Sequence, residues 1–282
     1  MTDPRPTSYV GTAGTLIGEV RRPAGDSRGL VVLLHGGGQT RHSWSRAAES
    51  LCATGWTTLT YDARGHGDSA WAADGAYDLQ LYVDDLERVL EQAGEGTAEA
   101  VVGASLGGMT GLMLLDRTPA AARSLVLVDI TPRPRPAGVM RIKEFMSANP
   151  EGFATLDDVA AAVSGYRTDD PPRDPERLRR SVRQRPDGRW RWHWDPAILP
   201  AGPEEDDPII HPEDVIAAAS RVRVPTLLVA GGSSDVVSGD EIRELLDVMP
   251  VARAVVLDGA SHMVVGDRND AFLREIHTFL GD

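Results

Sequence analysis

The apolar positions of this chain form short runs that alternate with longer segments of helical spacing. Runs of four or five aliphatic or β-branched residues, typical of buried strands, occupy 30–34, 57–61, 125–128, 226–230 and 254–257. The segment 15–22 alternates like a half-buried strand, and 100–102 is another short β-branched run. Strands that alternate with helices predict an α/β fold, a mostly parallel sheet wound on both faces by helices.

Helices are predicted between these strands from the spacing of apolar residues. The segment 78–93 is the most regular, because apolar side chains recur on one face at Leu79, Tyr82, Val83, Leu86 and Leu90. Further helices are predicted over 43–54, 107–115, 239–248 and 269–280.

The alternation stops between Thr131 and Val222. Proline is frequent there, aliphatic strands are lacking, and helices are predicted over 139–147, 156–166, 175–184 and 211–221. Such a stretch is too long for a loop inside a compact domain. We therefore predict a helical lid, 131–222, inserted after the sixth core strand into a core made of 1–130 and 223–282.

A Gly-x-Ser-x-Gly sequence follows the run at 100–102 and opens a helix. This is the strand–turn–helix context of a nucleophile elbow, with Ser105 at the turn. Gly103 and Gly107 supply positions with almost no side chain, and Gly108 lets the helix pack close to the sheet. The pattern alone is common, so the strand and helix around it carry the prediction. The N–H of Leu106 would face a developing oxyanion.

Other polar residues follow the predicted strands, at the edge where sites lie in open α/β sheets. Asp129, Asp235 and His262 each follow a late strand. The order Ser, Asp, His is that of the α/β-hydrolase triad. Asp235 is the expected acid and Asp129 the alternative, whereas His262 is expected to be the base because no other histidine ends a late strand.

These motifs together resemble the lidded α/β-hydrolases, a group that includes esterases, cofactor-free haloperoxidase-like enzymes and epoxide hydrolases. The resemblance runs from about Thr15 to the C-terminus. It is carried by the elbow and by Leu-Leu-His-Gly at 33–36 with Trp44 downstream, Tyr-Asp-Ala-Arg-Gly-His-Gly-Asp-Ser at 61–69, Gly-Gly-Ser-Ser-Asp at 231–235 and Gly-Ala-Ser-His at 259–262.

The resemblance implies acyl transfer by Ser105, His262 and Asp235, with the N–H groups of Gly37 and Leu106 as the oxyanion hole. Relatives that cleave epoxides or carbon–halogen bonds carry aspartate at the elbow, so serine favours an ester, thioester, lactone or amide. Hydrolysis of a C–C bond, perhydrolysis on the same triad and non-catalytic binding of a small ligand are the alternatives.

Several large side chains are candidates for the substrate pocket. Trp190, Trp192 and Trp194 alternate with Arg191 and His193, so an extended chain would present three indoles on one face, either to an apolar or aromatic substrate or to the core. The predicted substrate-binding residues are Trp44, Met109, Met140, Trp192 and Met263, each with simple packing as the alternative. Asp62, Arg64 and Asp68 are expected to form a structural ion-pair turn beside the site.

Net charge, motifs and cysteine content limit the classes of partner and cofactor that are expected for this chain. The formal net charge of −13 argues against nucleic acid and anionic membranes. The glycines at 36–38 lack the lysine or spacing of a phosphate cradle, and no cysteine–histidine cluster suggests a metal, so no cofactor is expected.

Cys52 is the only cysteine, which excludes an internal disulfide. The N-terminus has no signal-peptide pattern, and a cytoplasmic, bacterial protein is expected. The oligomeric state stays open.

Overall fold

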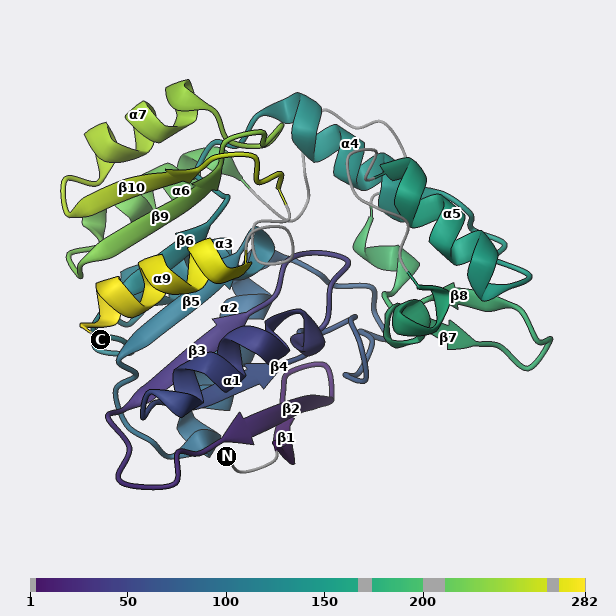
Figure 1. Cartoon of the computed structure of the whole chain (residues 1–282), viewed down its shortest axis with the longest axis horizontal. Helices are drawn as coiled ribbons and strands as arrows, with labels where there is room; N and C mark the ends of the chain where they lie inside the picture. Colours follow the sequence, from purple (N-terminus) through teal and green to yellow (C-terminus); the bar gives the residue numbers. More distant parts are fainter. Residues whose placement is uncertain (1–3, 167–173, 200–210, 263–268, 282) are drawn as a thin grey trace.

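An eight-stranded sheet forms the centre of the computed structural model, which describes residues 4–166, 174–199, 211–262 and 269–281. The strand order is β1-β2-β4-β3-β5-β6-β9-β10 (Figure 1). Two pairings, β1 with β2 and β2 with β4, are antiparallel, and the other neighbours are parallel. The strands are β1 (Arg5–Val10), β2 (Thr15–Arg21), β3 (Leu30–Leu34), β4 (Thr57–Tyr61), β5 (Ala100–Ala104), β6 (Leu125–Val128), β9 (Thr226–Gly231) and β10 (Ala252–Leu257).

Helices cover both faces of this sheet, which confirms the predicted α/β-hydrolase fold. Alternate strand residues point to opposite faces: Val31 and Leu33 pack with α1 and α9, whereas Val32 and Leu34 pack with α2 and α3. Among the described residues, no helix has both the length and the apolar character needed to cross a bilayer. The helices are α1 (Ser45–Ala53) after the 3₁₀ turn η1 (Arg41–Trp44), α2 (Leu79–Ala93), α3 (Leu106–Arg117), α6 (Pro212–Arg221), α7 (Gly239–Val248) and α9 (Asn269–Leu280).

The segment between β6 and α6 stands over the carboxyl edge of the sheet (Figure 1). It contains α4 (Pro136–Ser147), α5 (Leu156–Tyr166), η2 (Pro175–Ser181), β7 (Val182–Gln184), β8 (Trp190–Trp192) and η3 (Pro196–Ile198). We refer to residues 131–199 as the lid segment. The helix predicted over 175–184 is wrong at its end, because Val182 pairs with Trp192 in an antiparallel hairpin. α6 packs against α3 and α7, and the division of the chain at 131 and 222 stays a prediction.

A buried carboxylate joins three separate parts of the core. Asp85 on α2 is 1% exposed, and its Oδ2 accepts a hydrogen bond of 2.7 Å from Arg64 Nε in the loop after β4. Its Oδ1 accepts from the backbone and hydroxyl of Thr12, at 2.7 and 3.0 Å. Asp85 therefore ties α2 to the loops that follow β1 and β4.

Removing this carboxylate is expected to destabilise the fold. Asp85→Ala leaves the Arg64 guanidinium buried without its counter-charge, which costs about 3–5 kcal/mol of unfolding free energy. Asp84→Ala is the matched control, because Asp84 is 38% exposed and its ion pair with Arg117 is worth less than about 1 kcal/mol. Guanidinium-induced unfolding measures both, and equal losses would contradict the role given to Asp85.

Candidate active site

The turn at Ser105 has the geometry of an elbow. Ser105 follows β5 and caps α3 with φ of 46° and ψ of −116°, a conformation that side-chain-bearing residues rarely adopt. A Cβ on Gly103 would lie 2.3 Å from the backbone of Gly107, and one on Gly107 would lie 2.5 Å from Leu34 O. Both positions therefore require glycine, and the half-buried serine is held at the strand tip.

His262 is paired with Asp129. Its Nδ1 lies 2.7 Å from Asp129 Oδ2, and the carboxylate is fully buried at the end of β6. The same carboxylate accepts hydrogen bonds from Gly231 N at 2.7 Å and from Ser234 Oγ at 2.5 Å. An imidazole that donates from Nδ1 keeps the lone pair of Nε2 for a proton.

The structure corrects the expected partner of His262. Asp235 instead forms an ion pair of 2.9 Å with Arg141 on α4, and Arg141 also bonds the Tyr166 carbonyl and stacks on its ring. Asp235 thus joins the core to the lid segment. Asp129 directly follows β6 and has a φ of 49°.

The glycine loop after β3 runs beside the serine. A Cβ on Gly36 would lie 3.2 Å from the Ser105 Cβ. The flanking N–H groups are occupied, since Gly36 N donates to Gln39 Oε1 at 3.2 Å and Gly38 N donates to His66 Nε2 at 3.1 Å. Within the described ranges, the N–H groups of Gly37 and Leu106 donate to no protein acceptor. Leu106 is the first residue of α3, where such N–H groups attract negative charge.

A cavity of about 260 Å³ opens between the core and the lid segment. Ser105, Leu106 and His262 line its core side together with the glycines at 36–38. The opposite wall is mostly apolar. Its members include Val139, Ile142, Phe145, Met146, Val163, Leu178, Trp192, Trp194, Ile198 and Leu199. The Trp192 and Trp194 rings stack at 4.8 Å with an interplanar angle of 12°.

Of the four predicted pocket residues that the structure describes, only Trp192 is among those that line this cavity. Trp44 is buried on the face of the sheet that α1 and α9 cover, where its ring centroid lies 5.9 Å from that of Phe272. Met109 is buried in the core on the opposite face. Met140 is 56% exposed. Met263 lies outside the described residues.

Further residues of the cavity wall were not predicted from the sequence, because the apolar spacing did not show which face of α4 is turned toward the cavity. Phe145 and Met146 of α4 line the cavity, and Met146 lies beside Gly38. Trp190, the first of the three alternating indoles, lies under the Arg179 guanidinium instead.

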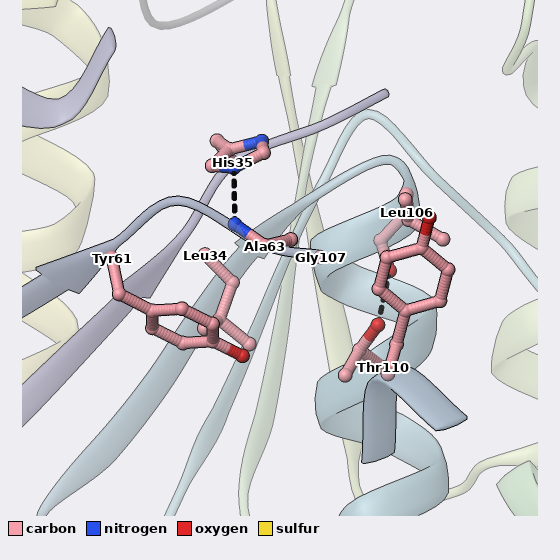
Figure 2. Close-up of a pocket in the computed structure, with 8 residues that line it drawn as sticks. Leu34, His35, Tyr61, Ala63, Leu106, Gly107 and Thr110 are labelled. Carbon is pink, nitrogen blue, oxygen red and sulfur yellow. Dashed lines mark hydrogen bonds between the residues drawn. The ribbon is translucent and has the colours of Figure 1, made fainter. Parts of the chain in front are cut away.

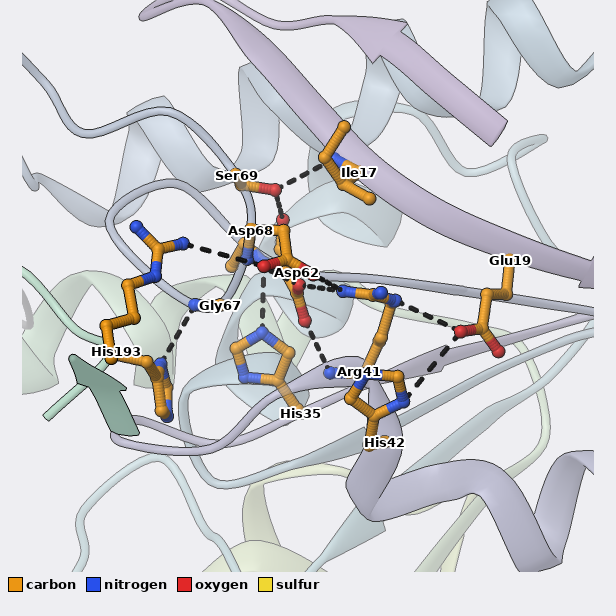
Figure 3. Close-up of polar contacts among 12 residues, drawn as sticks. Ile17, Glu19, His35, Arg41, His42, Asp62, Gly67, Asp68, Ser69 and His193 are labelled. Atoms are coloured by element: carbon orange, nitrogen blue, oxygen red, sulfur yellow. Dashed lines mark hydrogen bonds and ion pairs between the residues drawn. The ribbon is translucent and has the colours of Figure 1, made fainter. Parts of the chain in front are cut away.

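Acidic and basic residues hold the loop after β4 beside the cavity. Arg41 pairs with the fully buried Asp62 and, at 2.9 Å, with Asp68 (Figure 3). Asp62 Oδ1 also accepts from Arg41 N at 2.7 Å. Arg64, expected in the same ion-pair turn, binds Asp85 instead.

Three buried histidines lie under the glycine loop, and each accepts a backbone N–H. His35 Nε2 accepts from Ala63 N at 2.9 Å (Figure 2). His66 Nε2 accepts from Gly38, and His193 Nδ1 accepts from Gly67 N at 2.9 Å (Figure 3). Burial lowers the pKa of His35, lowers the pKa of His66 well below its ordinary value, and lowers the pKa of His193 to about 3.

Proteins of known identity resemble this chain over most of its length. The profile of the Alpha/beta hydrolase family matches residues 31–275. Esterase Rv0045c of Mycobacterium tuberculosis is 34% identical over 270 residues, which covers 91% of this chain and 84% of that protein. The 2-(acetamidomethylene)succinate hydrolase of Mesorhizobium japonicum is 28% identical over 226 residues, 80% of this chain and 78% of that one.

Solved structures agree in fold. A crystal structure of E-2-(acetamidomethylene)succinate hydrolase superposes with a TM-score of 0.85 at 23% identity, over 99% of this chain and 100% of that one. The crystal structure of Rv0045c from Mycobacterium tuberculosis gives a TM-score of 0.77 at 28% identity, over 100% and 92% of the two chains.

Stability is expected to fall as the pH drops below about 6.5. The pKa values of His35, His66 and His193 are lowered in the folded state. Below about pH 6.5 the unfolded chain therefore binds protons that the folded chain does not. Proton binding by the unfolded chain at these positions therefore lowers the unfolding free energy between about pH 7.5 and 5.5. Denaturant unfolding at three pH values measures this loss. A constant unfolding free energy would contradict it, and His193→Asn should reduce the pH dependence.

Proposed function

Because the chain belongs to the alpha/beta hydrolase family, we propose that it is a serine hydrolase that cleaves a carboxylic ester or related acyl bond through an acyl-enzyme. The observation that carries this proposal is one cavity lined by the elbow serine, by a histidine backed by a buried carboxylate, and by two backbone N–H groups that have no acceptor among the described residues. The similarity to an esterase supports the class of bond.

Each group has a role in the proposed reaction. His262 Nε2 takes the proton of Ser105 as Oγ attacks the acyl carbon, and then returns it to the leaving group. The N–H groups of Gly37 and Leu106 bind the oxyanion, and each such donor stabilises the transition state by roughly 3–4 kcal/mol. Water attacks the acyl-enzyme by the same route, which frees the acid and restores Ser105.

We assign the supporting acid to Asp129. Its carboxylate holds the Nδ1–H tautomer of His262 and stabilises the imidazolium that forms after proton transfer. The donors from Gly231 and Ser234 satisfy and orient this carboxylate, which is fully buried. Asp235 is neutralised by Arg141 and is left outside the reaction.

The cavity wall supports a small, apolar acyl substrate. Phe145 lies 5.4 Å from Trp192, which stacks on Trp194, so the wall facing the serine is an aromatic surface. A flat apolar or aromatic group would replace water on these rings at little cost in polar contacts.

Covalent labelling tests the nucleophile first. A fluorophosphonate is expected to add one adduct to the wild type and none to Ser105→Ala, as measured by intact mass, because only an activated hydroxyl attacks phosphorus. The variant should also lose turnover of p-nitrophenyl butyrate while keeping the wild-type melting temperature. An adduct on both proteins, or on neither, would overturn the assignment.

Two aspartates are compared in a second experiment. Asp129→Asn is expected to lower kcat about 10³–10⁴-fold, because the amide cannot hold the donating tautomer of His262. Asp235→Asn, the matched substitution, should change kcat less than about tenfold. The reverse order in steady-state kinetics would return the acid to Asp235.

A further inference from the structure

The proposed oxyanion donor Gly37 lies in a loop that is fixed at its neighbour. Gly38 N–H donates to His66 Nε2 at 3.1 Å, while the other ring nitrogen of His66, Nδ1, donates to Arg64 O at 2.9 Å. His66 is fully buried and lies under the loop, 5.1 Å from the ring of His35. The direction of the Gly37 N–H therefore depends on an imidazole that belongs to a different loop.

A histidine of the lid segment reaches the same place. His193 follows β8 and is 1% exposed, and its Nδ1 accepts from Gly67 N, next to His66 in the chain. The His66 and His193 rings are 6.1 Å apart. His193 thus contacts the turn that carries His66, whose ring accepts the Gly38 N–H.

We propose that His66 and His193 are positioning residues of the oxyanion hole, through which contacts from the core and from the lid segment fix the Gly37 N–H. His66 holds the loop from the core side, and His193 holds the Gly67 turn from the lid side. This inference rests on the proposed function, since the oxyanion hole has a role only if Ser105 attacks an acyl carbon.

The two nitrogens of His66 can be replaced separately. A glutamine side chain places its oxygen near Nε2 and can still accept from Gly38 N–H. An asparagine side chain reaches only as far as Nδ1, so it can bond Arg64 O but leaves Gly38 without an acceptor. His66→Gln and His66→Asn therefore form a matched pair of neutral amides: glutamine keeps the Gly38 contact and loses the Arg64 contact, and asparagine does the reverse.

Steady-state kinetics with p-nitrophenyl butyrate test the core contact. His66→Asn is expected to lower kcat about 10–100-fold with KM within about threefold, because the oxyanion forms only after substrate has bound. His66→Gln should retain most of the activity. Affinity for a trifluoromethyl ketone, which forms a tetrahedral adduct, should fall in parallel with kcat, whereas affinity for the matching methyl ketone should not.

The outcomes separate this inference from the proposed function. If the wild type takes no fluorophosphonate, the proposed function fails. If the wild type is labelled and His66→Asn matches it in kcat and inhibition, only the inference fails. Equal losses for both His66 variants, or equal losses of affinity for the two ketones, would show a merely structural role and would also overturn it.

A second pair of variants tests the link to the lid segment. Tyr77 Oη donates to Asp195 Oδ2 at 2.5 Å, so it joins the core to the lid segment without contacting the glycine loop. His193→Ala is expected to lower kcat about tenfold with KM little changed, whereas Tyr77→Phe should leave kcat within about threefold. Equal effects of the two substitutions on kcat would overturn the assignment of His193.

Discussion

The backbone of Ser105 is held at a φ of 46°, and such a conformation costs about 1–3 kcal/mol that the surrounding contacts must offset. Its N–H donates to Val128 O on the next strand, and its carbonyl accepts from Met109 N in the first turn of α3. The parallel pairing of β5 with β3 and β6 fixes the strand before the turn. The position of the serine is therefore a property of the whole sheet, and the groups around it are placed with reference to this turn.

The buried polar side chains beside the Ser105 turn form hydrogen bonds mainly with backbone groups. Asp129, His35, His66 and His193 each accept a backbone N–H, and the donors come from three different segments of the chain. Backbone partners are available at strand ends because the ladder of the sheet stops there. The carboxyl edge of the sheet thus supplies backbone donors both to a buried carboxylate and to three buried imidazoles.

Much of this arrangement could be predicted from local patterns in the sequence. The strands at 30–34, 57–61 and 125–128 were predicted with their observed bounds, because each is an unbroken run of aliphatic, β-branched or aromatic residues. The predicted elbow sequence adopts the expected turn, because glycine spacing is a steric requirement that can be read within five residues.

The features that could not be predicted depend on which parts of the folded chain come into contact with one another. Asp129 and Asp235 both follow strands, and only the paired strand ends and the position of α4 decide which of them faces His262. Trp44 was expected in the pocket, yet its ring packs against Phe272, more than 200 residues away in the chain. β1 was missed because its exposed residues give no apolar run.

The ion pair between Asp235 and Arg141 is partly exposed, at 35% and 49%, whereas the contact between Asp129 and His262 is buried. Dissolved ions screen exposed charges and hardly reach buried ones. A higher ionic strength should therefore weaken the attachment of α4 to the core and leave the contact between Asp129 and His262 unaffected. Because the two carboxylates follow different strands, natural substitutions can change how firmly α4 is attached to the core without altering the contact between Asp129 and His262.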